Sequence, residues 1–233
     1  ARRVDLPTYA WQRQRYWVEN RSNPRPALAD PVDDWFYQVA WPEVPQSPES
    51  SESPESKGSG KWLILADRWG VGEAVASALS SRGHICTVLA ASVAASTVRE
   101  QLDAHSDWRG VLYLGGLDAV IDANATGHQV EALTLRATAP VISLLQGLAG
   151  RAASPRLWLV TRGACAVGQE ESVAPCQAAL RALGRVAGLE HPAAWGGLLD
   201  LDPEGGVGEI AALVSEILAP DADAELAYRK GRR

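Results

Sequence analysis

The fold is decided by residues 61–89, which read KWLILADRWGVGEAVASALSSRGHICTVL. The apolar run Trp62–Ala66 has the length of a strand buried on both faces. Glu73–Arg82 is typical of a helix, and it ends at Gly83, a residue suited to a helix C-terminus. Ile85–Leu89 is a second apolar strand. This strand–helix–strand order predicts two parallel strands joined by a helix.

The same unit recurs along the rest of the chain. Further strands are expected at 110–114, 156–161, 197–201 and 225–229, and further helices at 96–105, 129–148, 174–190 and 208–218. Strands that alternate with helices in this way predict an α/β fold, a doubly wound, mostly parallel Rossmann-like sheet with right-handed crossovers. Helices are expected to cover both faces of that sheet.

Before this unit the sequence changes character. The segment Leu6–Trp17 holds two Trp and two Tyr with no helix or strand period, as expected of an extended arm that lies on another folded surface. The aromatic and β-branched run Trp35–Trp41 predicts a strand that ends at Pro42. Pro45–Gly60 is almost entirely Ser, Glu, Pro and Gly, which predicts a flexible acidic loop. We therefore expect an arm over residues 1–31 and one domain over residues 32–233.

Composition excludes several classes of protein. The 233 residues carry a net charge of −6 with both signs mixed, so nothing indicates a nucleic-acid or membrane-surface partner. Basic residues do gather at both ends of the chain, and we interpret them as solvated termini. Three scattered cysteines, Cys86, Cys165 and Cys176, suit neither a disulfide framework nor a zinc site. No apolar run is long enough to span a membrane and no signal peptide is recognised, so a cytoplasmic location is expected.

The turn after the first strand is where a Rossmann fold holds the pyrophosphate of a dinucleotide. Here it reads Asp67-Arg68-Trp69-Gly70-Val71-Gly72. Bulky Arg68 and Trp69 stand where bare backbone is needed, and Asp67 brings a negative charge to a phosphate site. The second strand ends in Leu89-Ala90-Ala91-Ser92, without a carboxylate for a ribose. We expect no cofactor-binding residue in this chain.

No catalytic or metal-binding residue is expected either. Ketone reduction by the short-chain dehydrogenase route needs a Tyr acidified by a Lys four residues later, and no Tyr-x-x-x-Lys occurs. Tyr113 lies in a predicted strand and Tyr228 lies near the end of the chain. The three lysines are Lys57, Lys61 and Lys230. The four histidines, expected at helix caps or on the surface, are His84, His105, His128 and His191.

Several of these segments together resemble one family. The arm Leu6–Trp17 is similar to the linker that follows the acyltransferase domain of modular type I polyketide synthases. The run Trp35–Trp41, the turn Trp69–Gly72 and, most specifically, Ala178–Pro192 are similar to the structural subdomain of the ketoreductases in these synthases. The segment 225–231 is similar to the closing strand of that subdomain. The resemblance covers nearly the whole chain, with the acidic loop as its variable part.

The resemblance implies a function for a chain without a site of its own. In that family the ketoreductase has two Rossmann-like halves, a cofactor-free structural half and a catalytic half that uses NADPH. The catalytic half is expected some tens of residues beyond Arg233. Residues 1–31 correspond to the linker from the acyltransferase, and residues 32–233 to the structural half. The parent module is expected to hold ketosynthase, acyltransferase, ketoreductase and a phosphopantetheine-bearing carrier in one polypeptide, as a homodimer that makes a β-hydroxyacyl thioester.

Other interpretations stay open. The chain could be an independent nucleotide-binding reductase with an atypical phosphate loop, in which Arg68 holds a phosphate. It could also be a free-standing interaction module, or the arm could be an ordinary docked N-terminus.

Two further expectations concern packing. Leu180, Leu183, Val186, Ala187 and Leu189 are expected to form one buried helix face, with Gly184 and Gly188 allowing close helix contact. This helix is expected either in the core or at the contact surface for the catalytic half. The run Trp35–Trp41 is expected to pair with the catalytic half rather than with this domain.

Overall fold

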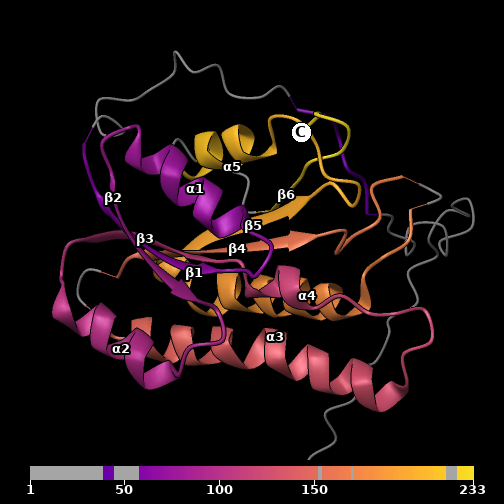
Figure 1. Ribbon diagram of the computed structural model, residues 1–233, viewed down its shortest axis with the longest axis horizontal. Helices are drawn as coiled ribbons and strands as arrows, with labels where there is room; N and C mark the ends of the chain where they lie inside the picture. Colours follow the sequence, from indigo (N-terminus) through magenta and orange to yellow (C-terminus); the bar gives the residue numbers. More distant parts are fainter. Residues whose placement is uncertain (1–38, 45–57, 152–153, 169–170, 219–224) are drawn as a thin grey trace, which may run out of the picture. The chain divides into compact units, whose positions relative to one another are not determined.

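The structure of the chain is a computed structural model that describes residues 39–44, 58–151, 154–168, 171–218 and 225–233. Its centre is a sheet of six parallel strands in the order β2-β1-β3-β4-β5-β6 (Figure 1). The strands are β1 Lys61–Ala66, β2 Ile85–Ala90, β3 Trp108–Tyr113, β4 Arg156–Arg162, β5 Trp195–Leu201 and β6 Glu225–Ala227. The strand order reverses between β1 and β3, so the predicted doubly wound, parallel sheet is confirmed.

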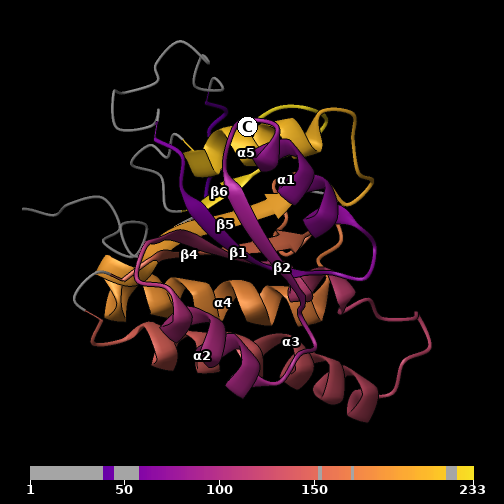
Figure 2. The ribbon, with the colours of Figure 1, turned by 60° about the vertical axis from the view of Figure 1, so that its left-hand side comes forward.

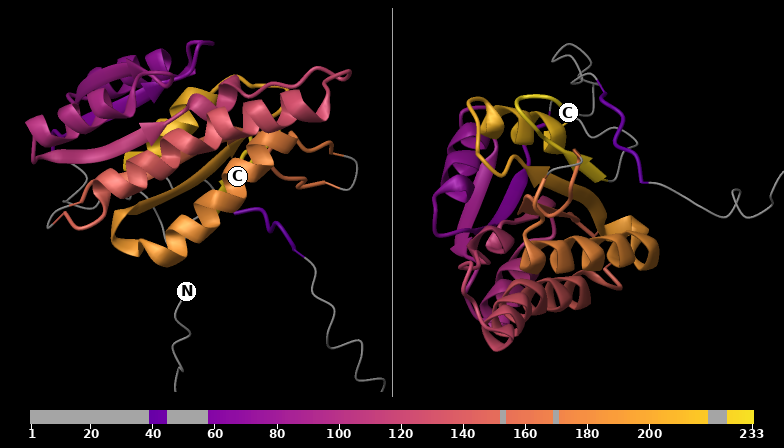
Figure 3. Two further views of the ribbon diagram at one scale, coloured as in Figure 1. Left: turned by 90° about the horizontal axis from the view of Figure 1, so that it is seen from below. Right: turned by 90° about the vertical axis from the view of Figure 1, so that its right-hand side faces the viewer.

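Helices cover both faces of the sheet, as Figure 2 shows. The helix α1 (Val71–Ser80) and the helix α5 (Glu209–Leu218) pack on one face. On the other face lie α2 (Ala95–Ala104), α3 (Gly127–Leu148) and α4 (Pro175–Glu190), side by side (Figure 3). Two short 3₁₀ turns, η4 (Gly115–Asp118) and η5 (Pro192–Ala194), follow β3 and α4.

The strand β1 shows why a continuous apolar run was needed. Side chains alternate between the two faces of a strand. Leu63 and Leu65 therefore join the core under α2, α3 and α4, while Trp62 and Ile64 join the core under α1 and α5. All four side chains are buried, because helices cover both faces.

The helix α3 begins two residues earlier than predicted because Thr126 caps it. The Thr126 hydroxyl accepts a hydrogen bond from the backbone N–H of Gln129 at 3.3 Å. The Gln129 side chain in turn accepts from the Thr126 backbone N–H at 2.8 Å, which completes a capping box. Pro140 lies inside the helix, which continues through it to Leu148.

The predicted buried face of α4 was partly wrong. Val186 and Leu189 are exposed, and the buried face contains Leu180, Gly184 and Ala187. A helix turns by about 100° per residue, so positions six and nine residues after Leu180 lie on the far side of the helix. A Cβ atom on Gly184 would lie 3.0 Å from Leu198 Cδ1 and 3.0 Å from a ring carbon of Trp195. Gly184 therefore allows α4 to pack closely on the sheet of its own domain.

The segment before the acidic loop is not a strand where the structure describes it. Residues 39–44 have no strand pairing, and residues 35–38 of the predicted strand lie outside the described residues. Instead, the backbone N–H of Val44 donates to the carbonyl of Arg233 at 2.9 Å. The ring of Trp41 lies under the guanidinium of Arg181 at 5.4 Å. The arm over residues 1–31 and residues 45–57 of the acidic loop also lie outside the described residues.

The last predicted strand is shorter than expected. It ends at Ala227, and a tight turn follows in which Arg229 and Arg232 form an antiparallel bridge. None of the helices that the structure describes is long and apolar enough to cross a membrane.

Candidate functional site

The turn after β1 is the first place to look for a cofactor site, because it lies at the carboxyl edge of the sheet where the strand order reverses. Gly70 precedes α1 with a φ of 93°, a left-handed conformation that favours glycine. A Cβ atom on Gly72 would lie 2.7 Å from the Ala66 Cβ, so this glycine lets the helix approach the strand. The turn therefore keeps the glycine geometry of a Rossmann fold.

The ligand position in this turn is filled by the chain itself. The Asp67 carboxylate accepts hydrogen bonds from the backbone N–H groups of Gly72 at 2.7 Å, Trp69 at 2.9 Å and Val71 at 3.3 Å. Such N–H groups at a helix N-terminus are the ones that bind phosphate in dinucleotide folds. Here a buried carboxylate already occupies them. The sequence showed an acidic residue in the turn but not that its side chain folds back onto the helix.

The neighbouring Arg68 is also engaged. Its guanidinium lies 4.6 Å from the centre of the exposed Trp69 ring. Its backbone N–H donates to Asp118 Oδ1 at 3.0 Å, and its Nε lies 3.8 Å from the same oxygen. Arg68 therefore interacts with a ring and a carboxylate at the position where the alternative interpretation needed it to hold a phosphate.

The tyrosines of the α/β domain, Tyr113 and Tyr228, are buried and hydrogen-bonded. The Tyr113 hydroxyl donates to the Ala137 carbonyl of α3 at 2.9 Å, and burial, followed by the charge of Asp118, raises its pKa. The Tyr228 hydroxyl donates to Glu216 at 3.2 Å, and burial, followed by the charge of Glu216, raises its pKa. Of the lysines, Lys61 pairs with Asp107 at 3.0 Å on the surface, and Lys57 lies outside the described residues. Among the residues that the structure describes, the hydrogen bonds of the two tyrosine hydroxyls go to a carbonyl and a carboxylate, and none goes to a lysine of the kind that acidifies a catalytic tyrosine.

A second group of polar residues surrounds Asp200 at the end of β5. This carboxylate is fully buried and accepts from the Thr161 hydroxyl at 2.6 Å, from the Ala164 backbone N–H at 2.8 Å and from Arg229 Nη2 at 2.7 Å. Arg229 also donates to Glu171 at 3.0 Å. The network is satisfied internally, and it ties the final turn of the domain to β5.

The thiol of Cys165 lies within this network and is not activated by it. Burial and the charge of Asp200 raise its pKa to about 12, so it stays protonated at neutral pH. No cluster of three or more metal-ligating side chains occurs in the part of the chain that the structure describes.

Of the histidines, His84 differs from its expected place. It is buried, and its Nδ1 accepts a hydrogen bond from the Gly60 backbone N–H at 3.1 Å. Burial, followed by the nearby charge of Arg109, lowers its pKa. His84 therefore fixes the entry to β1. This contact could not be predicted from the sequence because it joins residues 24 positions apart.

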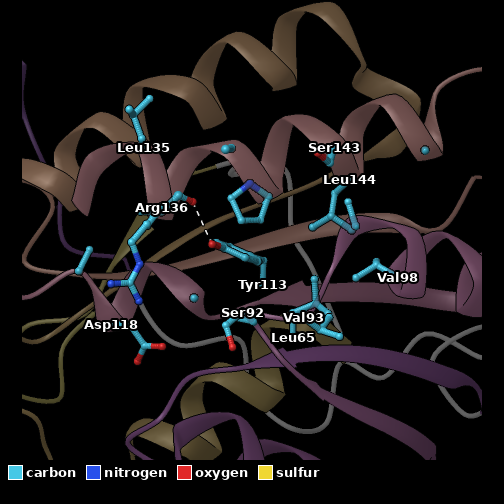
Figure 4. A pocket seen from close by; sticks show the side chains of 18 of the residues that line it. Leu65, Ser92, Val93, Val98, Tyr113, Asp118, Leu135, Arg136, Ser143 and Leu144 are labelled. Atoms are coloured by element: carbon cyan, nitrogen blue, oxygen red, sulfur yellow. Dashed lines mark hydrogen bonds between the residues drawn. The ribbon is translucent and has the colours of Figure 1, made fainter. Parts of the chain in front are cut away.

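A cavity of about 510 Å³ lies next to the filled turn, along the groove between α2 and α3 (Figure 4). Its floor is formed by Leu65 of β1 and Tyr113 of β3, and its walls include Val98 of α2 and Leu144 of α3. Asp118 and Arg136 lie at the end of the cavity near the carboxyl edge of the sheet. Small-molecule sites have cavities of roughly 300–1,000 Å³ with a mostly apolar lining. This cavity has no signature in the sequence, because it depends on how two helices pack.

Comparison with known proteins identifies the family to which this chain belongs. Residues 39–233 match the family described as polyketide synthase extender module SpnB, Rossmann fold domain. The chain is 34% identical over 213 residues to the pikromycin polyketide synthase component PikAII of Streptomyces venezuelae, an alignment that covers 84% of this chain and 5% of that protein. It is 32% identical over 232 residues to the erythronolide synthase EryA3 of Saccharopolyspora erythraea, which covers 98% of this chain and 7% of that protein.

A solved structure agrees with these relatives. The C2-type ketoreductase from a modular polyketide synthase is 30% identical, with a TM-score of 0.59 over 75% of this chain and 39% of that chain. This chain thus spans a small part of the synthases and about two fifths of the ketoreductase. It belongs to the Rossmann fold domain family of polyketide synthase extender modules and forms part of a ketoreductase region.

Proposed function

We propose that this chain is the structural, non-catalytic half of a ketoreductase in a modular polyketide synthase. It braces a second half, which binds NADPH and reduces a β-ketoacyl thioester on a carrier protein to the β-hydroxyacyl product. Residues 1–31 link it to the acyltransferase of the same cytoplasmic polypeptide. The observation that carries the proposal is the Asp67 carboxylate, which occupies the N–H groups of α1 that a cofactor pyrophosphate would need.

A surface suited to a second half lies on the outside of α3 and α4. We call it the outer apolar face, and its residues are Leu135, Ala139 and Ile142 of α3 and Ala182, Val186 and Leu189 of α4. Leu189 is 85% exposed and Leu135 is 58% exposed. The two helices lie side by side on the sheet, so their outer sides face the same way (Figure 3). Neighbouring exposed apolar side chains mark an interaction surface.

The segment around Trp41 is a second proposed contact with that half. Within the described residues, Trp41 and Val44 lie against Arg181 and Arg233 of this domain. We propose that residues 35–41 connect the two halves. A Trp41→Ser change is then expected to lower ketoreduction in the complete module more than it lowers the stability of this chain. Equal large losses would mean that Trp41 serves only this domain.

The first test of the proposal is cofactor binding. Calorimetric titration of the 233-residue chain with NADPH is expected to show no binding, and the chain alone should not reduce a model β-ketothioester. A dissociation constant in the low micromolar range, which corresponds to a binding free energy of about −8 kcal/mol, would support the independent nucleotide-binding reductase instead.

The second test measures the brace. This chain and the half that follows it can be produced as separate polypeptides and their association measured. Leu135→Lys or Val186→Lys is expected to weaken association and to reduce ketoreductase activity. Val207→Lys is the matched control, because Val207 is fully exposed and lies in the loop before α5, on the opposite face of the sheet. An outer-face variant that behaves like the control would count against the proposed surface.

A further inference from the structure

The cavity between α2 and α3 has an apolar interior that side chains of this domain leave unfilled. Leu102 and Tyr113 are about 1% exposed, and Leu65 is equally buried. The Tyr113 hydroxyl at the floor of the cavity already donates a hydrogen bond to the Ala137 carbonyl. The floor therefore offers contact to an apolar group, while Ser92 and Ser143 add hydroxyl groups to the lining.

The charged side chains at the rim of the cavity are two arginines and one aspartate, so the rim carries a net positive charge. Arg99 of α2 and Arg136 of α3 line it from its two walls. Neither has an ion pair among the residues that the structure describes. Among the described lining residues, Asp118 is the one carboxylate, and it interacts with Arg68.

We propose that this cavity binds a small amphipathic monocarboxylate. Its apolar chain lies over Leu65, Val98 and Leu144, and its carboxylate binds the Arg136 guanidinium at the mouth of the cavity (Figure 4). A single negative charge is favoured over a phosphate dianion because Asp118 lies at the same end of the cavity. A dinucleotide is disfavoured because Asp67 occupies the adjoining phosphate turn. Leu135 and Ala139 line the cavity and also belong to the outer apolar face. The residues proposed to contact the ligand, Leu65, Val98, Leu144 and Arg136, are not part of that face, so the proposal does not rest on the proposed function.

Three eight-carbon probes test the chemistry of the ligand. The full 233-residue chain is titrated calorimetrically with octanoate, octanol and octyl phosphate. Octanoate is expected to bind with a submillimolar dissociation constant and about tenfold more tightly than octanol, as expected for one hydrogen-bonded charge pair. Octyl phosphate is expected to bind more weakly than octanoate. No submillimolar binding of octanoate, or equal binding of octanoate and octanol, would overturn the proposal.

Variants test the location. Arg136→Gln is expected to reduce the affinity for octanoate to that for octanol and to leave the affinity for octanol unchanged. Arg82→Gln, on the opposite face of the sheet, is the control and should change neither affinity. Gly147→Met should weaken all three probes, because a Cβ atom at this position points toward Leu102 Cδ1 at 3.8 Å. Gly147→Ala is its control and should bind like the parent chain, with melting curves to verify folding. An unchanged octanoate affinity in both Arg136→Gln and Gly147→Met, or displacement of octanoate by NADPH, would assign binding to another site.

Discussion

The Asp67 carboxylate accepts a hydrogen bond from the Gly72 backbone N–H at 2.7 Å, so an acidic side chain caps α1 where other Rossmann folds hold a phosphate. Asp67 and Gly72 are both buried. The interaction also places a negative charge at the positive end of the helix dipole, which is stabilising. The carboxylate that accepts from these N–H groups therefore also stabilises the fold.

Removing this cap is expected to destabilise the domain. Asp67→Ala should lower the free energy of unfolding by about 0.5–2 kcal/mol, because the N–H groups of Trp69 and Gly72 lose their acceptor. Asp67→Asn keeps one acceptor oxygen and should lose less. Urea unfolding of the three proteins measures the difference. An Asp67→Ala variant as stable as the parent chain would show that the cap is not needed.

Overpacking α4 is expected to cost more than changing its exposed side. Gly184→Leu should lower the free energy of unfolding by roughly 1–3 kcal/mol, since even a Cβ atom there would lie 3.0 Å from Leu198 and Trp195. Ala182→Leu, on the exposed side of the same helix, is the control and should change stability by less than about 0.5 kcal/mol. Thermal unfolding compares the two. Similar melting temperatures for both variants would contradict the packing described for Gly184.

Acid should destabilise the domain partly through His84. Its pKa is lowered in the folded chain, mainly by burial, so the unfolded chain binds more protons once the pH falls below the ordinary histidine value of about 6.5. The contribution of His84 to stability is thus present above that value and is lost as the pH falls through it toward the lowered folded pKa.

His84→Asn isolates this effect, because asparagine offers an acceptor for the Gly60 N–H and does not titrate. The difference in unfolding free energy between parent and variant, measured at pH 7.5 and pH 5.5, should shift against the parent at the lower pH. Other titrating groups are common to both proteins and cancel. A difference that does not depend on pH would show that His84 is protonated equally in the folded and unfolded chains.

Breaking the buried ion pair at the end of β5 should be severe. Arg229→Met leaves Asp200 buried without its charged partner and should cost about 3–5 kcal/mol. The double variant Asp200→Asn with Arg229→Met should lose less, because no unpaired charge remains. Arg232→Met is the matched control, since Arg232 pairs with Glu43 on the surface and such pairs contribute about 0–1 kcal/mol. Equal losses for Arg229→Met and Arg232→Met would contradict the assigned role of Asp200.

The sheet could be predicted from the sequence because its strands are buried on both faces, which leaves continuous apolar runs such as Trp62–Ala66. The buried face of α4 was harder to predict from the sequence. Apolar residues also occupy its exposed side, so Val186 and Leu189 could not be told from core residues by composition.

The contacts at the candidate sites were harder to predict, because they join residues that are distant in sequence or depend on side-chain direction. Arg229 and Asp200 are 29 residues apart, and the pair is recognised only when β5 and β6 are adjacent. The hydrogen bonds of Asp67 join residues that are close in the sequence, but its position alone is compatible both with repulsion of a phosphate and with capping of a helix. The cavity requires the spacing of α2 and α3, which the hydrophobic pattern does not specify.

The hydrogen bond between Val44 and Arg233 has a consequence for how such a domain can be exchanged. The two residues lie near the start and at the end of the unit that spans residues 40–233. The segment that leads into the domain and the turn around Arg233 therefore lie together, although they are far apart in the sequence. An exchange between synthases that takes both segments from one parent is expected to preserve this contact, whereas a cut between Val44 and β1 would combine two segments that did not evolve together.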